Sequence, residues 1–115
     1  MRQYKVYIQD IIKAVNAIEK FVENMDIKSF LSDDKTSSAV IRKFEIMGEA
    51  AKQVPSEIQS QFPEIPWKEI ARMRDKLIHH YAGVNLFILY ETIENELPKL
   101  KEKLAVMLSK LNSME

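Results

Sequence analysis

Cysteine is absent from this sequence, and its 115 residues include only two glycines and four prolines. The lack of cysteine excludes disulfides, thiolate catalysis and the zinc or iron–sulfur sites that use thiolate ligands. So few glycines and prolines leave little material for the tight turns of a sheet protein. Long apolar runs are also lacking, because charged residues interrupt the first twenty positions every few residues. We therefore expect a cytoplasmic protein without a signal peptide or membrane span.

Net charge is missing as well, since 17 Lys and Arg balance 17 Asp and Glu. A neutral chain lacks the general attraction to phosphate of a nucleic-acid coat protein, so any contact with RNA requires a concentrated basic patch. The hydrophobic fraction of 46% and the charged fraction of 30% are typical of a globular protein. The length suits one domain over residues 1–115, and no internal repeat or low-complexity tract is evident.

Apolar residues recur at intervals of three and four along much of the chain, which is the pattern of amphipathic helices. These stripes are Tyr4, Ile8, Ile11, Ile12, Val15, Ile18, Val22 and Met25, then Val40, Phe44, Met47, Ala51 and Val54, and finally Leu86, Leu89, Ile93, Leu97, Leu100, Leu104, Leu108 and Leu111. No segment alternates with period two for long enough to indicate a sheet. The pattern predicts an all-α, up-and-down bundle of four main helices plus a short extra helix.

Prolines and capping residues predict where these helices begin and end. The second helix should stop before Pro55, and its N-cap candidates are Ser32, Asp33 and Asp34. Residues 55–66 form a connector with one short helix. Pro66 suits the first position of the next helix, for which Gly83 is a natural C-terminal stop. Asn85 can cap the last helix, which Pro98 should kink or split.

Ionisable residues cluster in RMRDKLIHHY, residues 72–81, just before Gly83. Asp75 and His79 are four residues apart on a helix, so the carboxylate can contact the imidazole. Arg74 and His79 are five apart, about 140° around the helix axis, so they do not share a face. Either Arg74 reaches across, or the helix loosens near Gly83, or a second chain completes a site.

The same cluster has ordinary explanations. Basic side chains near a helix C-terminus interact favourably with the helix dipole, and Tyr81 suits the rim of a core. Spacings typical of metal ligands, such as HxxxH and HExxH, are absent, as are a nucleophile elbow and a glycine-rich phosphate loop. The residues alone therefore indicate neither a metal nor a cofactor.

Arg74, His79 and Tyr81 form an Arg-x4-His-x-Tyr pattern, which resembles the signature of HepT-like toxins in the HEPN superfamily. The segments AVIRKFEIMGEAAKQVP (39–55), FPEIPWKEIARMRDKLIHHYAGVN (62–85) and ENELPKLKEKL (94–104) are similar to that family in the same order. The residue after the arginine is often Asn in the wider superfamily, whereas this chain has Asp75. As a supporting residue, Asp75 would hold His79 in one tautomer and favour its protonated form.

The resemblance implies a metal-independent endoribonuclease in which a ribose 2′-OH attacks the adjacent phosphate. His79 would serve as acid or base, and Arg74 would donate hydrogen bonds to the phosphoryl oxygens. One motif histidine per chain then implies a homodimer whose two motifs line a shared cleft. Exposed cations would form its basic rim: Lys68, Arg72 and Lys76. Glu45 and Glu49 could face this cleft, and Gly48 is either a point of close helix approach or a tolerated helix glycine.

The resemblance also implies a protein partner. HepT-like toxins usually accompany an MNT-type nucleotidyltransferase antitoxin, which attaches AMP to the motif tyrosine, here Tyr81. The alternative is a non-catalytic HEPN dimer that serves as a nucleotide- or protein-binding scaffold. A plain helical adaptor would leave the cluster of Arg74, His79 and Tyr81 without a role.

Overall fold

Helices make up most of the chain, whose computed structural model describes residues 3–79 and 84–114. They are α1 (Gln3–Phe21), α2 (Ile27–Ser32), α3 (Asp34–Gln53), α4 (Ser56–Gln61), α5 (Trp67–His79), α6 (Leu86–Asn95) and α7 (Leu97–Ser113). No strand occurs in these two described ranges. The predicted all-α class is confirmed.

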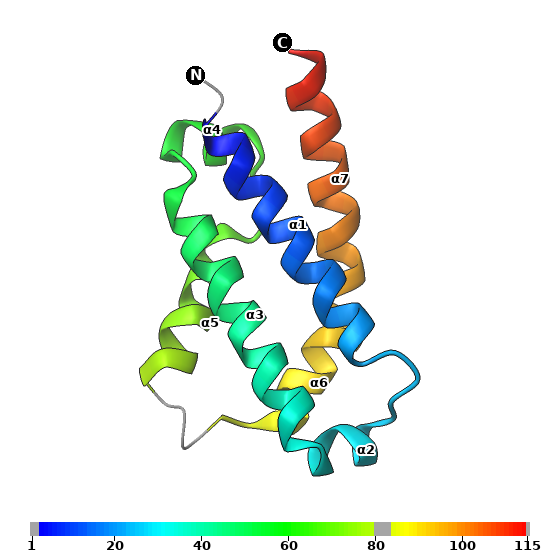
Figure 1. Cartoon of the computed structure of the whole chain (residues 1–115). Helices are drawn as coiled ribbons and strands as arrows, with labels where there is room; N and C mark the ends of the chain where they lie inside the picture. Colours follow the sequence, from blue (N-terminus) through cyan, green and yellow to red (C-terminus); the bar gives the residue numbers. More distant parts are fainter. Residues whose placement is uncertain (1–2, 80–83, 115) are drawn as a thin grey trace.

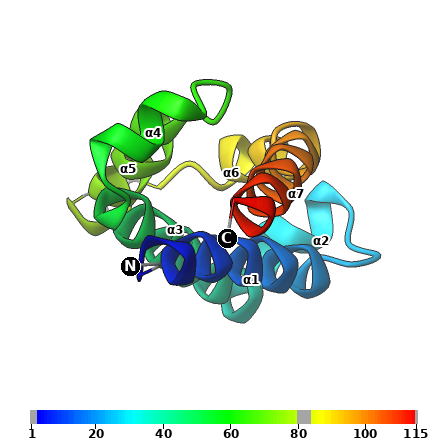
Figure 2. The ribbon, with the colours of Figure 1, turned by 90° about the horizontal axis from the view of Figure 1, so that it is seen from above.

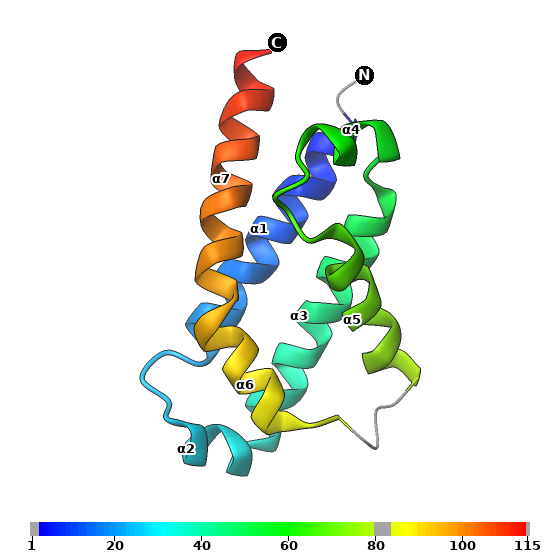
Figure 3. The ribbon, with the colours of Figure 1, turned by 180° about the vertical axis from the view of Figure 1, so that it is seen from behind.

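The long helices run up and down beside one another (Figure 1). Helix α3 packs against both α1 and α5, and α1 also packs against α7. Seen from above, α4 and α5 lie to one side and α6 and α7 to the other, with α1 and α3 below them (Figure 2). The view from behind shows α5 beside α3 along its length (Figure 3). Within the described ranges, no helix is both long and apolar enough to cross a membrane.

Most residues of the predicted stripes are buried in the core, which also includes Phe30, Phe62, Ile65 and Trp67. The last stripe is shifted at one position, because Met107 has no exposed surface while Leu108 is only partly buried. The buried seam therefore runs Leu97, Leu100, Leu104, Met107, Leu111. Steps that alternate between three and four residues keep a seam on one narrow face of a helix. Met107 continues that alternation after Leu104, whereas Leu108 lies just outside the face.

An Asp and an Asn side chain cap α3 and α6. The carboxylate of Asp33 accepts a hydrogen bond from the backbone N–H of Thr36 at 3.0 Å, so Asp33 is the N-cap of α3 among the three candidates. This N–H lowers the pKa of Asp33, because it stabilises the ionised carboxylate. Asn85 caps α6 by accepting from Ile88 N–H at 3.1 Å, as predicted.

Prolines end helices at two of the predicted places. Helix α3 ends at Gln53, before Pro55. The last apolar stripe is split between α6 and α7 at Glu96, because Pro98 has no N–H with which to continue the ladder of α6. Helix α5 begins at Trp67, one residue after Pro66, and its predicted stop at Gly83 lies outside the described residues.

The connector before α5 is tied to the bundle by two side chains. Gln59 donates from Nε2 to the carbonyl oxygens of Ala51 and Val54, at 3.2 and 3.1 Å. The indole N–H of the buried Trp67 donates to the Phe62 carbonyl oxygen at 3.1 Å. These bonds satisfy polar groups at the end of α3 and the start of α5. They fix the position at which α5 begins. Because α5 carries Arg74, they also help to place Arg74.

Candidate active site between helices α3 and α5

Helices α3 and α5 approach each other closely at Gly48. It is buried, and a Cβ added to it would overlap with Arg74 Cβ and lie 2.9 Å from Arg74 Cγ. The same Cβ would be 3.0 Å from the carbonyl oxygen of Ile70. Only a residue without a side chain allows this spacing of the two helices. Gly48 is therefore a point of close helix approach and not simply a tolerated glycine.

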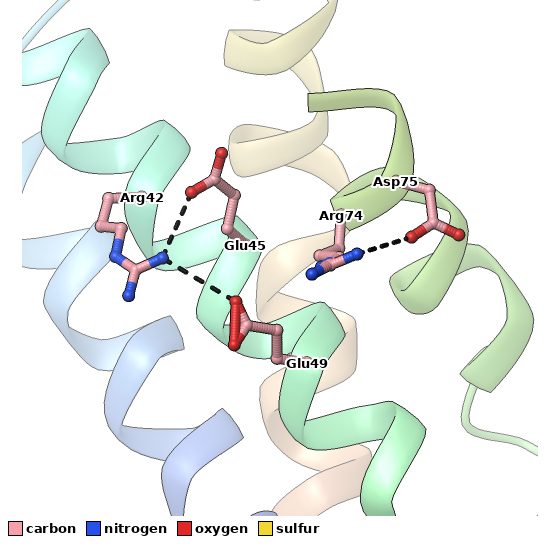
Figure 4. Close-up of polar contacts among 5 residues, drawn as sticks. All are labelled: Arg42, Glu45, Glu49, Arg74 and Asp75. Atoms are coloured by element: carbon pink, nitrogen blue, oxygen red, sulfur yellow. Dashed lines mark hydrogen bonds and ion pairs between the residues drawn. The ribbon is translucent and has the colours of Figure 1, made fainter. Parts of the chain in front are cut away.

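Arg74 emerges from this contact with its guanidinium between α5 and α3 (Figure 4). Its side chain is only 28% exposed, and Nη1 donates to Asp75 Oδ1 at 3.2 Å. Its Nε is buried and has no hydrogen-bond partner within the described part of the chain. A buried donor without a partner costs free energy, so such groups are rare in native proteins and often belong to functional sites.

Asp75 connects Arg74 to the neighbouring helix. The same Oδ1 atom that accepts from Arg74 also accepts from Nζ of Lys52, in α3, at 2.5 Å. Lys52 and then Arg74 lower the pKa of Asp75 through these bonds, so the carboxylate is ionised at neutral pH. Lys52 was not among the site residues predicted from the sequence. Its spacing of four residues from Gly48, which places both on one face of α3, is the signal that could have found it.

A cavity of about 440 Å³ lies beside Arg74. It is lined from α1, α3 and α5 by Tyr7, Asp10, Ile46, Glu49, Ala50, Lys52, Gln53 and Arg74. Glu49 lines this cavity, and its place in a shared cleft of two chains stays a prediction. Glu45 is not among the lining residues; it pairs with Arg42 at 3.3 Å, and Arg42 also lies 3.8 Å from Glu49 (Figure 4). The cavity combines a tyrosine ring, an amide and charges of both signs, which suits a polar ligand with a flat part.

The histidine and tyrosine of the motif are described only in part. His79 is the last residue of α5, and its side chain lies outside the described part of the chain, as does the whole of Tyr81. The structure thus brings Arg74, Asp75 and Lys52 together. The contact between Asp75 and His79 and the placement of Tyr81 stay predictions. Three cations expected at the rim are exposed on α5: Lys68, Arg72 and Lys76.

Comparison with known proteins identifies relatives over most of the chain. Residues 11–107 match the family described as "Ribonuclease HepT-like". "Probable ribonuclease HepT" of Thermococcus cleftensis is 48% identical over 89% of this chain and 93% of its own. A "Putative RNase" of Methanocaldococcus jannaschii is 40% identical over 84% and 80%. Another of that name, from Caldanaerobacter subterraneus subsp. tengcongensis, is 38% identical over 96% and 98%. No solved structure matches.

Proposed function

The chain belongs to the HepT-like ribonuclease family of the HEPN superfamily, and from this premise we propose that it is an endoribonuclease toxin whose catalytic residues are Arg74 and His79. The observation that carries the proposal is the state of Arg74. Its side chain is mostly buried, its Nε is buried with no partner among the described residues, and it borders a polar cavity. A cation held in this way is suited to bind a phosphate group.

The proposed reaction is cleavage of RNA by its own 2′-hydroxyl. The 2′-oxygen attacks the adjacent phosphorus as a base removes its proton, and the bond to the 5′-oxygen breaks as an acid protonates that oxygen. The products are a 2′,3′-cyclic phosphate and a 5′-hydroxyl. Arg74 donates to the non-bridging oxygens, where negative charge builds up in the transition state. His79 supplies acid or base catalysis, because the pKa of an imidazole is near ~6.5. None of these steps requires a metal ion.

Asp75 is proposed as a supporting residue on the same helix. Its Oδ1 is held by Lys52 and Arg74, and it lies one helical turn before His79. In the proposed arrangement Asp75 also orients the imidazole of His79 and favours its protonated form. The ionised state of the carboxylate, which follows from its lowered pKa, supports this role.

The proposed enzyme is a homodimer, because acid and base catalysis together need a motif histidine from each chain. An exposed apolar surface near the C-terminal half of α5 supports this. Phe87 and Ile88 are 51% and 57% exposed at the start of α6. Ile88 also lines a pocket of about 330 Å³ with α5 residues Met73 and Leu77. A second copy of the chain would cover this surface and bring the two motifs together.

The dimer can be tested with one pair of variants. Ile88→Glu places a charge in the proposed interface and should yield monomers by light scattering, with loss of cleavage. Val106→Glu changes a similarly exposed residue, at 54%, on α7, and should leave both properties unchanged. A monomeric wild-type protein that cleaves RNA would contradict the two-chain site.

The proposed regulation is addition of AMP to Tyr81 by an MNT-type nucleotidyltransferase antitoxin. Tyr81 is two residues from His79, so a phosphodiester on its hydroxyl would bring negative charge to the RNA site and repel substrate. The protein should be co-expressed with a nucleotidyltransferase encoded by a neighbouring gene. Mass spectrometry should then find AMP on the peptide that contains Tyr81. Tyr81→Phe should escape modification and remain toxic. AMP on another residue, or equal neutralisation of Tyr81→Phe, would contradict this mechanism.

Cleavage of a labelled RNA pool in the presence of EDTA tests the enzymatic proposal against a non-catalytic scaffold. We expect wild-type protein to leave 2′,3′-cyclic phosphate ends and His79→Ala to be inactive. His80→Ala is the matched control, since it removes the adjacent imidazole and should have a much smaller effect. A scaffold would bind RNA, nucleotide or protein and yield no new ends with any variant.

A further inference from the structure

We propose that Lys52 is a positioning residue, which acts through Asp75 to hold the guanidinium of Arg74 at the cavity between α1, α3 and α5. This inference rests on the proposed function, because Arg74 is the group whose position matters for RNA cleavage. Neither the motif nor the family resemblance assigns a role to Lys52. It comes from α3, whereas the motif residues Arg74, His79 and Tyr81 follow one another closely in the sequence, beginning in α5.

The geometry of α3 directs Lys52 toward α5. Gly48 and Lys52 are four residues apart and so lie on the same face, one turn from each other. Gly48 brings that face against α5 at Arg74. The next turn of the same face therefore places Lys52 where its long side chain can reach over α5, and it contacts the residue next to Arg74.

Asp75 and Arg74 are adjacent in the sequence. Adjacent residues on a helix do not face each other, so the guanidinium of Arg74 must turn around the helix to meet the carboxylate. The hydrogen bond from Lys52 fixes that carboxylate from the neighbouring helix, at 2.5 Å, and the same oxygen receives Arg74 Nη1 at 3.2 Å. With one end of the guanidinium held in this way, Nε stays buried and without a partner within the described residues.

A second interhelical ion pair shows what an ordinary surface contact looks like in this molecule. Lys101 of α7 lies 2.9 Å from Glu19 of α1, and the two side chains are 49% and 32% exposed. Lys52 and Asp75 are similarly exposed, at 38% and 47%. The difference is a second hydrogen bond, which Asp75 accepts from the half-buried Arg74 beside the cavity. Lys101 is therefore a matched control of the same charge and length and of similar exposure.

The kinetic test compares Lys52→Met, Lys52→Arg and Lys101→Met in the full chain, with a labelled RNA substrate. Misplacement of a catalytic group by about 1 Å can lower a rate by ~10²-fold. We expect Lys52→Met to lower kcat by between ~10-fold and ~10²-fold with KM nearly unchanged. Lys52→Arg should recover most of the rate, and Lys101→Met should behave as wild type. An increased KM with unchanged kcat would show that Lys52 binds RNA directly and would overturn the inference.

A double-mutant cycle tests whether Lys52 acts through Asp75. If it does, Lys52→Met should cost little further activity once Asp75→Asn is present, because the link is already weakened. Losses that multiply in the double variant would mean that the two residues act independently, and the positioning role would be wrong.

A measurement without RNA separates this inference from the proposed function. The ¹⁵N–¹H resonance of Arg74 Nε, assigned by its absence in Arg74→Lys, reports the surroundings of the guanidinium. It should shift in Lys52→Met and stay in place in Lys101→Met. If the resonance responds while wild-type protein cuts no RNA, the proposed function fails and the positioning stands. If it does not move in Lys52→Met, the inference is overturned, whatever the protein does to RNA.

Discussion

Helices α1 and α5 both pack against α3, and their contacts with it differ in kind. Helix α1 buries a continuous aliphatic stripe in which Ile8, Ile11, Val15 and Ile18 have no exposed surface. Helix α5 meets α3 at a glycine, and the residue at that contact is an arginine. One face gains stability from apolar area removed from water, whereas the other holds a cation that is mostly shielded from water and incompletely hydrogen-bonded.

The contrast shows that apolar packing is less complete at the α3–α5 contact, where the proposed catalytic residue Arg74 lies. A large aliphatic residue at position 74 with a partner side chain at position 48 would resemble the core around α1. Instead Gly48 contributes no side chain to the contact, and Arg74 Nε has no partner in the described residues. Such local departures from good packing are expected where a protein binds or reacts.

The largest effect on stability should come from the aliphatic core. Leu104 has no exposed surface, so Leu104→Ala should lower the free energy of unfolding by about 2–5 kcal/mol through lost burial and a cavity. Urea denaturation followed by circular dichroism measures this. The cleavage rate per folded molecule should be unchanged, since α7 contributes no residue to the cavity beside Arg74. A loss of less than about 1 kcal/mol would mean that the core around Leu104 is looser than described.

Gly48→Ala should destabilise the protein, although alanine normally improves a helix by roughly 0.5–1 kcal/mol. The new methyl group would overlap with Arg74 Cβ, which cannot move without the backbone of α5. Forced overpacking typically costs about 1–3 kcal/mol, so we expect a net loss of stability in the same denaturation experiment. The displaced Arg74 should also lower the cleavage rate. A more stable and fully active Gly48→Ala would show that the close approach is not important.

The smallest expected effect is on the pH dependence of stability, through Asp75. The pKa of Asp75 is lowered by Lys52 and Arg74 in the folded chain, so its contribution to stability is present above the unfolded value of about 4. That contribution is lost as the pH falls through the folded pKa. Asp75→Asn should therefore melt at a lower temperature than wild type at pH 7, and the difference should shrink at pH 3. A difference that grows in acid would contradict the assigned sign.

The parts of the fold that depend on neighbouring residues in the sequence could be predicted. Helical periodicity identified the core stripes, and side-chain caps and prolines marked helix ends at Asp33, Asn85 and Pro98. These features depend on contacts over three or four residues, which the order of residues shows directly. The one shift in the last stripe, from Leu108 to Met107, depends on how α7 is rotated against its neighbours.

The candidate site was only half predictable for the same reason. Arg74 and Asp75 stand out because they belong to a motif along one helix. Lys52 is 23 residues from Asp75, and their contact depends on how α3 and α5 cross. Gly48 sets that crossing, but a single glycine in a helix has no pattern that distinguishes close approach from tolerance. Contacts between residues on different helices can be identified only from the packed structure.

The cleavage rate of Arg74→Ala, measured under single-turnover conditions with EDTA present, tests the central claim most directly. Arg74 is held beside the cavity and contributes little to the core, so the variant should keep the circular dichroism and melting behaviour of a folded protein. Removal of one donor to a developing negative charge typically lowers a rate by ~10² to ~10³-fold. We predict a loss of that size relative to wild type. Cleavage at the wild-type rate by a folded Arg74→Ala would contradict the account.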